Sequence, residues 1–269
     1  MPKVQNNPYA TFNGSIRTNY APYGIQRSQN SSQIDYFTHS LNSQNAQTNP
    51  ILHKINECLV RVAPKIFLSK YINENAIKQA AKTNPKIQEL LASKGLAVNV
   101  DMKNVTGEIE KHFIETYSKA KELGHDLPLN EYGSMLQAAL LHDIGKAFIP
   151  REILDKPAAL TPEEKEIVDL HAEIGAEVLK AMNLNPRVVE AVKIHHIDSS
   201  NPIKQNNKMA QILSVADVYS ALKDKRPYKK AFTNEQVRNI MQNDLRLNQD
   251  VVSTLFFQQD LSDMSNFKL

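Results

Sequence analysis

The charge balance of this 269-residue chain excludes a dedicated nucleic-acid binder, since 32 Lys and Arg residues against 29 Asp and Glu residues leave a net charge of only +3. Its length and its 41% hydrophobic content allow a substantial core, and its single cysteine excludes an intrachain disulfide framework. The sequence has no apolar leader and no run of about 20 apolar residues. We therefore expect a cytoplasmic protein that binds neither a membrane nor a nucleic-acid polymer.

Residues 1–49 form a polar segment, crowded with Asn, Gln, Ser, Tyr and Thr, as in RSQNSSQ and LNSQNAQTNP. Few aliphatic residues there could join a core, so we predict a disordered tail. Tyrosines scattered through Asn/Gln-rich sequence can also mediate weak association, which leaves a partner-binding tail as the alternative.

Residues 50–104 differ from this tail in having apolar residues at helical spacing. The stretch ILHKINECLVRVAPKIFLSKYI shows that spacing, broken near Pro64, and NPKIQELLASKGL is a further helix candidate. We predict a small helical subregion here that packs against the main domain.

Residues 105–249 contain one helical pattern after another, including GEIEKHFIETYSKAKELG, EYGSMLQAALLHDIG, TPEEKEIVDLHAEIGAEVLKAMN and NKMAQILSVADVYSALK. Several of these segments start with Thr or Asn followed by Pro or Glu, and several stop at Gly or Asn. Convincing strand alternation is absent. The pattern predicts an all-α bundle with one core, followed by a C-terminal helix or tail at 250–269.

Ionisable side chains recur along these predicted helices. One buried histidine is more simply explained as a hydrogen-bonded core residue than as a ligand, but several ionisable groups in one core are costly unless they pair or bind metal. The presence of several such groups on the helices of one core therefore favours a metal centre. The candidate ligands are His112, His142, His171, His195, His196, Glu108, Asp143 and Asp217.

Their spacing restricts how these residues could share an ion. Glu108 and His112 are four residues apart, which places both on one helix face. His142 and Asp143 are adjacent, so on a regular helix their side chains point about 100° apart. Both can reach a shared ion only at a helix end or beside a second metal, and two metals that share a carboxylate satisfy this requirement.

The ordered series EIEKH, LLHDIGK, LHAEIGAEVL, KIHH and ILSVADVYSALKDKRPYKKA resembles the HD-domain metal-dependent phosphohydrolases. Within them it is similar to the HD-GYP branch, which hydrolyses cyclic dinucleotides. The resemblance covers about residues 105–245 and implies an HD-domain helical bundle. It also implies two or three divalent metal ions, iron or manganese, held by the eight candidate ligands. Asp143 would bridge two of these metals, and Glu108 would help to hold a third.

The same resemblance implies hydrolysis of a phosphodiester by a metal-bridged hydroxide, with a cyclic dinucleotide such as cyclic di-GMP or another phosphoester as substrate. Asp143 and Lys146 would be catalytic, because Lys146 resembles the family's phosphate-facing lysine. Lys225 and Arg226 would offset phosphate charge if their loop faces the site, although an ordinary surface loop explains them equally well. The partner expected of such a domain is a signalling protein.

The stretch HHIDSSNPIKQNNKMAQ departs from the HD-GYP pattern. Ile197 stands where the branch has a glutamate, and the loop with Asp-Gly-x-Gly-Tyr-Pro is missing. Two alternatives therefore stay open. One is a catalytically weak HD domain that binds a nucleotide or serves as a scaffold. The other is an HD phosphohydrolase that acts on a mononucleotide or another phosphoester.

Overall fold

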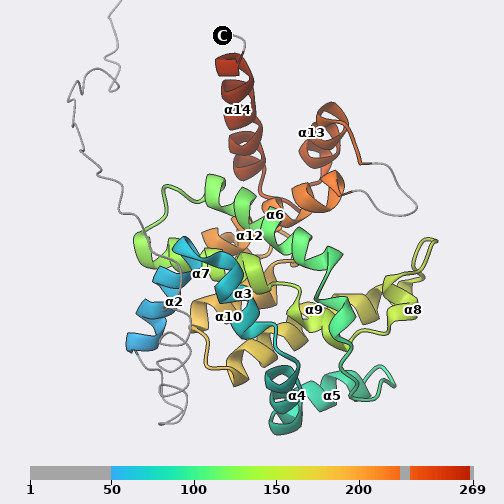
Figure 1. The fold of residues 1–269 in the computed structure, drawn as a ribbon. Helices are drawn as coiled ribbons and strands as arrows, with labels where there is room; N and C mark the ends of the chain where they lie inside the picture. The colour runs from blue at the N-terminus through green and yellow to red at the C-terminus, as the bar shows by residue number, and fades with distance from the viewer. Residues whose placement is uncertain (1–49, 225–230, 267–269) are drawn as a thin grey trace, which may run out of the picture. The chain divides into compact units, whose positions relative to one another are not determined.

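Every regular element of the described chain is a helix, which confirms the predicted all-α class (Figure 1). The computed structural model describes residues 50–224 and 231–266. The tail predicted at 1–49 lies outside the described residues, as do the substrate-binding candidates Lys225 and Arg226. The side chain of Glu108 also lies outside the description, although its backbone begins a helix.

In chain order the α-helices and the two short 3-10 helices, η1 and η2, are α2 (Pro50–Val62), α3 (Pro64–Tyr71), α4 (Glu74–Thr83), α5 (Pro85–Ala92), η1 (Met102–Asn104), α6 (Glu108–Leu123), α7 (Leu129–Leu141), η2 (Ile144–Phe148), α8 (Arg151–Leu154), α9 (Pro162–Ala181), α10 (Pro186–Ile194), α11 (Pro202–Gln205), α12 (Lys208–Lys223), α13 (Asn234–Asn243) and α14 (Gln249–Asn266). None of the helices in this part of the chain combines the length and the apolarity needed to cross a membrane.

The helix starts follow the capping pattern of the sequence. At α9 the side chain of Thr161 accepts a hydrogen bond from the backbone N–H of Glu164, whose carboxylate accepts one from the N–H of Thr161. Pro162 follows in the first turn, where a missing N–H does no harm. Asparagine side chains cap α4, α5, α10, α11 and α12. These starts are therefore local properties of the sequence.

Two helices form the centre of the core. Helix α7 is buried from Gly133 to Leu141, and α12 is buried from Met209 to Asp217, because both carry small or apolar residues on nearly every face. Helices α6 and α10 each pack against both of them, and α9 packs against α10 and η2. The inner ends of these helices therefore meet in one region.

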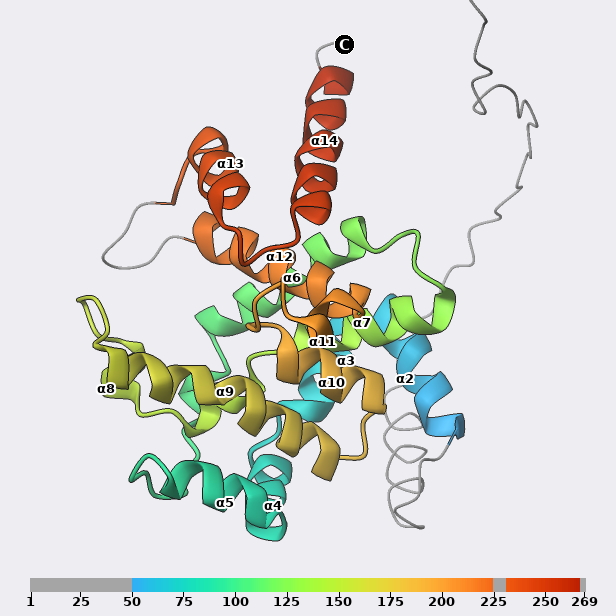
Figure 2. The same cartoon turned by 180° about the vertical axis from the view of Figure 1, so that it is seen from behind.

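The other helices surround this centre. Helices α2 and α3 contact α7, and α4 and α5 contact α9. Helices α13 and α14 contact α12 and each other, and α11 lies against α12 (Figure 2). The residues between 50 and 104 thus make their contacts with the helices that carry the candidate site.

Candidate metal centre

The structure brings together side chains that lie far apart in the sequence. His112 and Asp217 are separated by 105 positions, and their Nε2 and Oδ1 atoms lie 3.0 Å apart. The predicted ligands found in this region are His112 of α6, His142 and Asp143 after α7, His171 of α9, His195 and His196 after α10, and Asp217 of α12. The position of the Glu108 side chain is not described, so its ligand role stays a prediction.

The end of α7 explains how two adjacent residues face one site. The helix ends at Leu141; His142 is its C-cap, with φ −55° and ψ −35°, and Asp143 follows with φ −96° and ψ 7°. The Nδ1 atom of His142 lies 3.0 Å from the carbonyl oxygen of Ala139, which makes Nδ1 the protonated donor and turns Nε2 toward the site. The two side chains converge because the regular helix stops between them.

A first cluster consists of His112, His142 and Asp143, whose ligand atoms lie within 4.8 Å of one another. Asp217 joins it, since its Oδ1 lies 3.0 Å from Nε2 of His112 and 3.4 Å from Nε2 of His142. The Oδ2 atom of Asp143 lies 3.3 Å from Nε2 of His142. Within the described residues, Nε2 of His142 is buried and has no hydrogen-bond partner of adequate geometry. Two imidazoles and two carboxylates with such an orphaned nitrogen fit a divalent metal ion.

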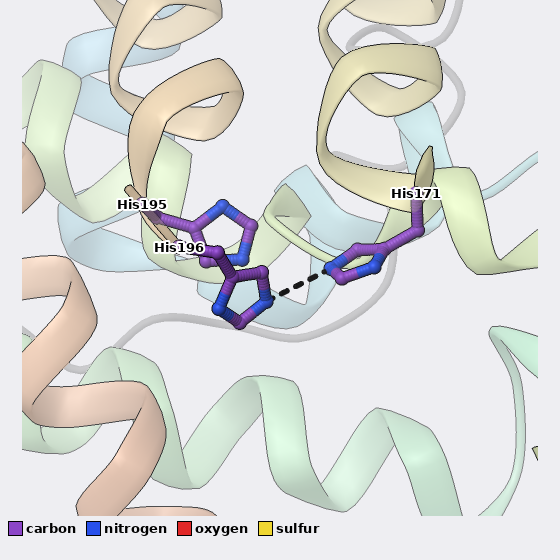
Figure 3. A group of neighbouring side chains, drawn as sticks. All are labelled: His171, His195 and His196. Carbon is purple, nitrogen blue, oxygen red and sulfur yellow. Dashed lines mark hydrogen bonds between the residues drawn. The ribbon is translucent and has the colours of Figure 1, made fainter. Parts of the chain in front are cut away.

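A second cluster consists of His171, His195 and His196, which reach one another from α9 and from the end of α10 (Figure 3). The Nδ1 atoms of His171 and His195 donate to the carbonyl oxygens of Val168 and Val192, at 2.5 and 2.6 Å, so in the neutral imidazoles Nε2 is the nitrogen that can bind metal. The Nε2 atoms of His171 and His196 lie 3.2 Å apart. Since Nε2 of His195 is buried without a hydrogen-bond partner among the described residues, this cluster also fits a metal ion.

Asp143 lies between the two clusters. Its Oδ2 faces His142, whereas its Oδ1 lies 3.1 Å from Nε2 of His171 in the second cluster. The side chain is buried and has one carboxylate oxygen toward each group of histidines. A carboxylate in this position can serve two metal ions at once.

Opposite charges dominate the first cluster. Burial alone would raise the pKa of Asp143, but His142 and Lys146 outweigh it and hold this pKa well below its usual range. Burial likewise disfavours ionised Asp217, but the hydrogen bond with His112 and the nearby His142 ring reverse the effect on its pKa. Burial would lower the pKa of His142, but Asp143 and Asp217 raise it to about 10. Both carboxylates are therefore ionised beside an imidazolium when no metal is bound.

The second cluster behaves differently. Burial and the neighbouring imidazoles hold the pKa of His195 well below its usual range. His196 keeps part of its surface open to solvent, yet the surrounding protein atoms and His171 lower its pKa to about 4. These two imidazoles are neutral at physiological pH, which is the form that binds metal.

Gly145 permits the close approach between η2 and α9 that brings Asp143 to His171. A Cβ atom at Gly145 would overlap the backbone carbonyl oxygen of His171 and lie 2.7 Å from the backbone nitrogen of Gly175. Backbone atoms cannot move aside as a flexible side chain can, so only glycine fits this position. Next to it, the Nζ atom of the partly exposed Lys146 lies 2.6 Å from Oδ2 of Asp143. The lysine therefore stands beside the bridging carboxylate.

Sequence reasoning missed one residue of the site, Asp224. Its Oδ2 lies 3.2 Å from Nδ1 of His112, on the far side of that ring from Asp217. Carboxylates that contact the second ring nitrogen of a ligating histidine fix its orientation. The signal in the sequence was the seven-residue spacing from Asp217 to Asp224, the C-cap of α12, which is about two helical turns and places both residues on the same side of the helix.

Comparison with known proteins supports the resemblance to HD domains that the sequence showed. Residues 109–222 match the HD domain family. This range begins just before His112 and includes the clusters described above, up to and beyond Asp217. Over these residues the chain is similar to HD domains.

Its named relatives are bacterial cyclic-dinucleotide phosphodiesterases. The chain is 39% identical over 103 residues to a cyclic di-GMP phosphodiesterase of Pseudomonas aeruginosa, covering 35% of this chain and 25% of the relative. It is 41% identical over 102 residues to a cyclic di-GMP phosphodiesterase of Thermotoga maritima, covering 34% and 27%. It is 32% identical over 123 residues to the 3'3'-cGAMP-specific phosphodiesterase 2 of Vibrio cholerae, covering 42% and 24%. The matched part spans about a quarter of the length of each relative.

Proposed function

We propose that this chain is a metal-dependent phosphodiesterase that hydrolyses a cyclic dinucleotide, with cyclic di-GMP as the first candidate. The observation that carries the proposal is the buried carboxylate of Asp143, which has one oxygen toward each of two histidine clusters. The names of the relatives, which describe cyclic di-GMP and 3'3'-cGAMP phosphodiesterases, support the substrate class.

The chain's own residues supply two metal positions. One would be held by His112, His142, Asp143 and Asp217, and the other by Asp143, His171, His195 and His196. Glu108 is kept as the proposed ligand of a third ion. Divalent ions bound here, iron or manganese by our proposal, would lower the pKa of a coordinated water and neutralise charge on a phosphodiester.

Asp143 and Lys146 have the central roles in this proposal. Asp143 sets the separation of the two positions, because its carboxylate contacts both clusters. Lys146 is exposed enough to meet a substrate and would offset phosphate charge once Asp143 is engaged by metal. Lys225 and Arg226 are proposed as further phosphate contacts. A cytoplasmic location and a signalling protein as partner remain predictions from the sequence.

The segment after His196 favours a second candidate function. Ile197 and the short helix α11 occupy the place of the loop expected of HD-GYP proteins. A pocket with a different wall can accept another phosphoester, such as a mononucleotide, or can bind a nucleotide with little turnover. We therefore keep these two functions as the alternatives.

Metal analysis of anaerobically purified protein, combined with a chromatographic assay of cyclic di-GMP in the presence of Mn²⁺ or Fe²⁺, tests the proposal. Two or three metals per chain with release of a linear dinucleotide or mononucleotides would support it. Metals without turnover would favour one of the alternatives, and a parallel assay with 3'3'-cGAMP and mononucleotides would separate them. A folded protein that takes up no metal would refute it.

A further inference from the structure

The segment between residues 197 and 207 contains a buried lysine that the proposed chemistry does not use. Lys204 lies in α11 and is only 1% exposed. Among the described residues, no carboxylate lies within ion-pair distance of its Nζ atom. Burial lowers the pKa of this ammonium group, and the more distant carboxylates of Asp198, Asp217 and Asp244 act in the opposite direction. A buried ammonium group that forms no direct ion pair is costly unless hydrogen bonds satisfy it, and a lysine is rarely kept in such a place without a local reason.

The contacts of Lys204 supply that reason. Its Nζ donates to the carbonyl oxygen of His195 at 2.8 Å and to that of Ile197 at 2.5 Å. Both carbonyls belong to the turn that ends α10, where the last carbonyl groups of a helix have no partner within the helix. A cation is favoured at this end of a helix dipole. The ammonium group therefore holds together the turn that presents His195 and His196.

The turn is held from a second direction as well. The hydroxyl of Ser214, on α12, donates to the same carbonyl oxygen of His195. The side chain of Gln211, also on α12, donates to the carbonyl oxygens of Lys204 and Gln205 at 3.0 and 2.9 Å. Helix α12, which carries Asp217, thus fixes α11, and α11 fixes the turn of the double histidine.

We propose that Lys204 is a positioning residue for the second metal cluster, in which it sets the backbone of the His195–His196 turn so that both imidazoles face His171. Adjacent residues on a regular helix cannot both do this, because their side chains point about 100° apart. The short segment from Ile197 to Asn207 is thereby tied to the metal centre through one ammonium group. This inference rests on the metal centre of the proposed function.

The test compares Lys204→Met with Lys208→Met. Methionine keeps most of the length of the lysine stem but leaves the carbonyl oxygens of His195 and Ile197 without the ammonium donor. Lys208 is exposed and begins α12, four residues after Lys204. Lys208→Met removes the same charge, so this variant is the matched control. Circular dichroism establishes that each variant is folded. If Lys204→Met does not fold, Lys204→Gln, which stays polar and keeps a shorter donor, takes its place.

The first readout is the NMR spectrum of the histidine side chains after removal of metal by a chelator. We expect the signals of His195 and His196 to shift in Lys204→Met, while those of His112 and His142 stay as in the parent. The second readout is an anaerobic Mn²⁺ titration. One metal should bind as in the parent and the other about 10- to 100-fold more weakly, the usual loss when a group that orients a ligand is removed. Lys208→Met should match the parent in both readouts.

Unchanged imidazole signals and unchanged affinity for both metals in a folded Lys204 variant would overturn the inference. Equal changes at all histidines would also overturn it, because they would show a general loss of packing. Neither readout uses turnover, so a parent protein that binds metal without hydrolysing cyclic di-GMP would contradict the proposed function and leave this test intact. The NMR readout also stands if the parent binds no metal.

Discussion

The Oδ1 atom of Asp143 lies 3.1 Å from the Nε2 atom of His171, and this contact joins the two histidine clusters into one site. The two residues come from η2's start and from α9, which touch because Gly145 has no side chain. The two clusters can share Asp143 only while this contact and the close approach at Gly145 are kept.

Replacement of Asp143 by alanine should remove metal from both clusters and abolish turnover together, because both clusters use its carboxylate. We expect less than one metal per chain and a loss of turnover of at least ~100-fold. Elemental analysis and the cyclic di-GMP assay measure the two effects. Asp263→Ala, which removes an exposed carboxylate from α14, is the control. Full metal content in Asp143→Ala would show that the carboxylate does not bridge.

Replacement of Lys146 by alanine should lower turnover without removing metal. Metal content should stay at the parent level, because an ammonium group is not a metal ligand. Turnover should fall about 10²-fold, the scale of losing one group that stabilises developing charge on phosphate. Lys103→Ala serves as an exposed control near the site. Loss of metal in Lys146→Ala would contradict the assigned role.

Replacement of Gly145 by alanine should separate η2 from α9, because the new methyl group overlaps the carbonyl oxygen of His171. We expect a loss of stability of about 1–3 kcal/mol and weaker metal binding. Thermal unfolding and metal titration check both. At Gly133 the three atoms nearest to the new methyl group belong to the flexible side chains of Glu57 and Arg61, so Gly133→Ala is the matched control. Equal behaviour of the two variants would argue against a special close approach at Gly145.

Asp224 should influence the first cluster through His112. Asp224→Ala removes the carboxylate whose Oδ2 lies 3.2 Å from Nδ1 of His112, and we expect one metal to bind about 10-fold more weakly. Asp224→Asn keeps a side-chain oxygen and should lose less. Metal titration of the two variants measures the difference. Identical affinities in both variants and the parent would show that the contact has no effect on the ligand.

Metal binding should release a proton from His142 of the first cluster and none from His195 or His196 of the second. Asp143 and Asp217 raise the pKa of His142 to about 10, against the lowering by burial, so its imidazole is protonated at pH 7 and must lose that proton to bind metal. The affinity of this cluster should rise about tenfold per pH unit for each proton released, up to pH ~10. The pKa of His196 is about 4, so binding at the second cluster should not change between pH 6 and pH 9 because of this residue. Calorimetry in buffers of different ionisation enthalpy counts the protons.

The raised pKa of His142 also affects the stability of the metal-free protein. Because the folded-state pKa of His142 lies above its ordinary value of 6.5, its protonated form stabilises the fold. This contribution is complete below pH ~6.5 and is lost as the pH rises through about 10. Urea unfolding of chelator-treated protein at pH 7 and pH 9.5 should show lower stability at the higher pH. Higher stability at pH 9.5 would contradict the raised pKa.

Much of this protein could be predicted from its sequence because the relevant signals are local. Helical spacing of apolar residues, the Thr161 cap and the runs around His142 and His195 depend only on neighbouring residues, and they indicated the all-α class and the resemblance to HD domains. The candidate ligands were likewise named from residue type and spacing.

Only the tertiary structure decided how these residues meet. His112 approaches Asp217 across 105 positions, and the direction of each oxygen of Asp143 depends on where α7 ends and how closely η2 packs on α9. The roles of Asp224 and Lys204 were likewise visible only in three dimensions, since one contacts a ring on another helix and the other contacts two backbone carbonyls. The sequence by itself determined which groups could bind metal, because side-chain chemistry and helical spacing are local. The packing of the helices decided which groups share an ion, because that depends on distances between residues remote in the chain.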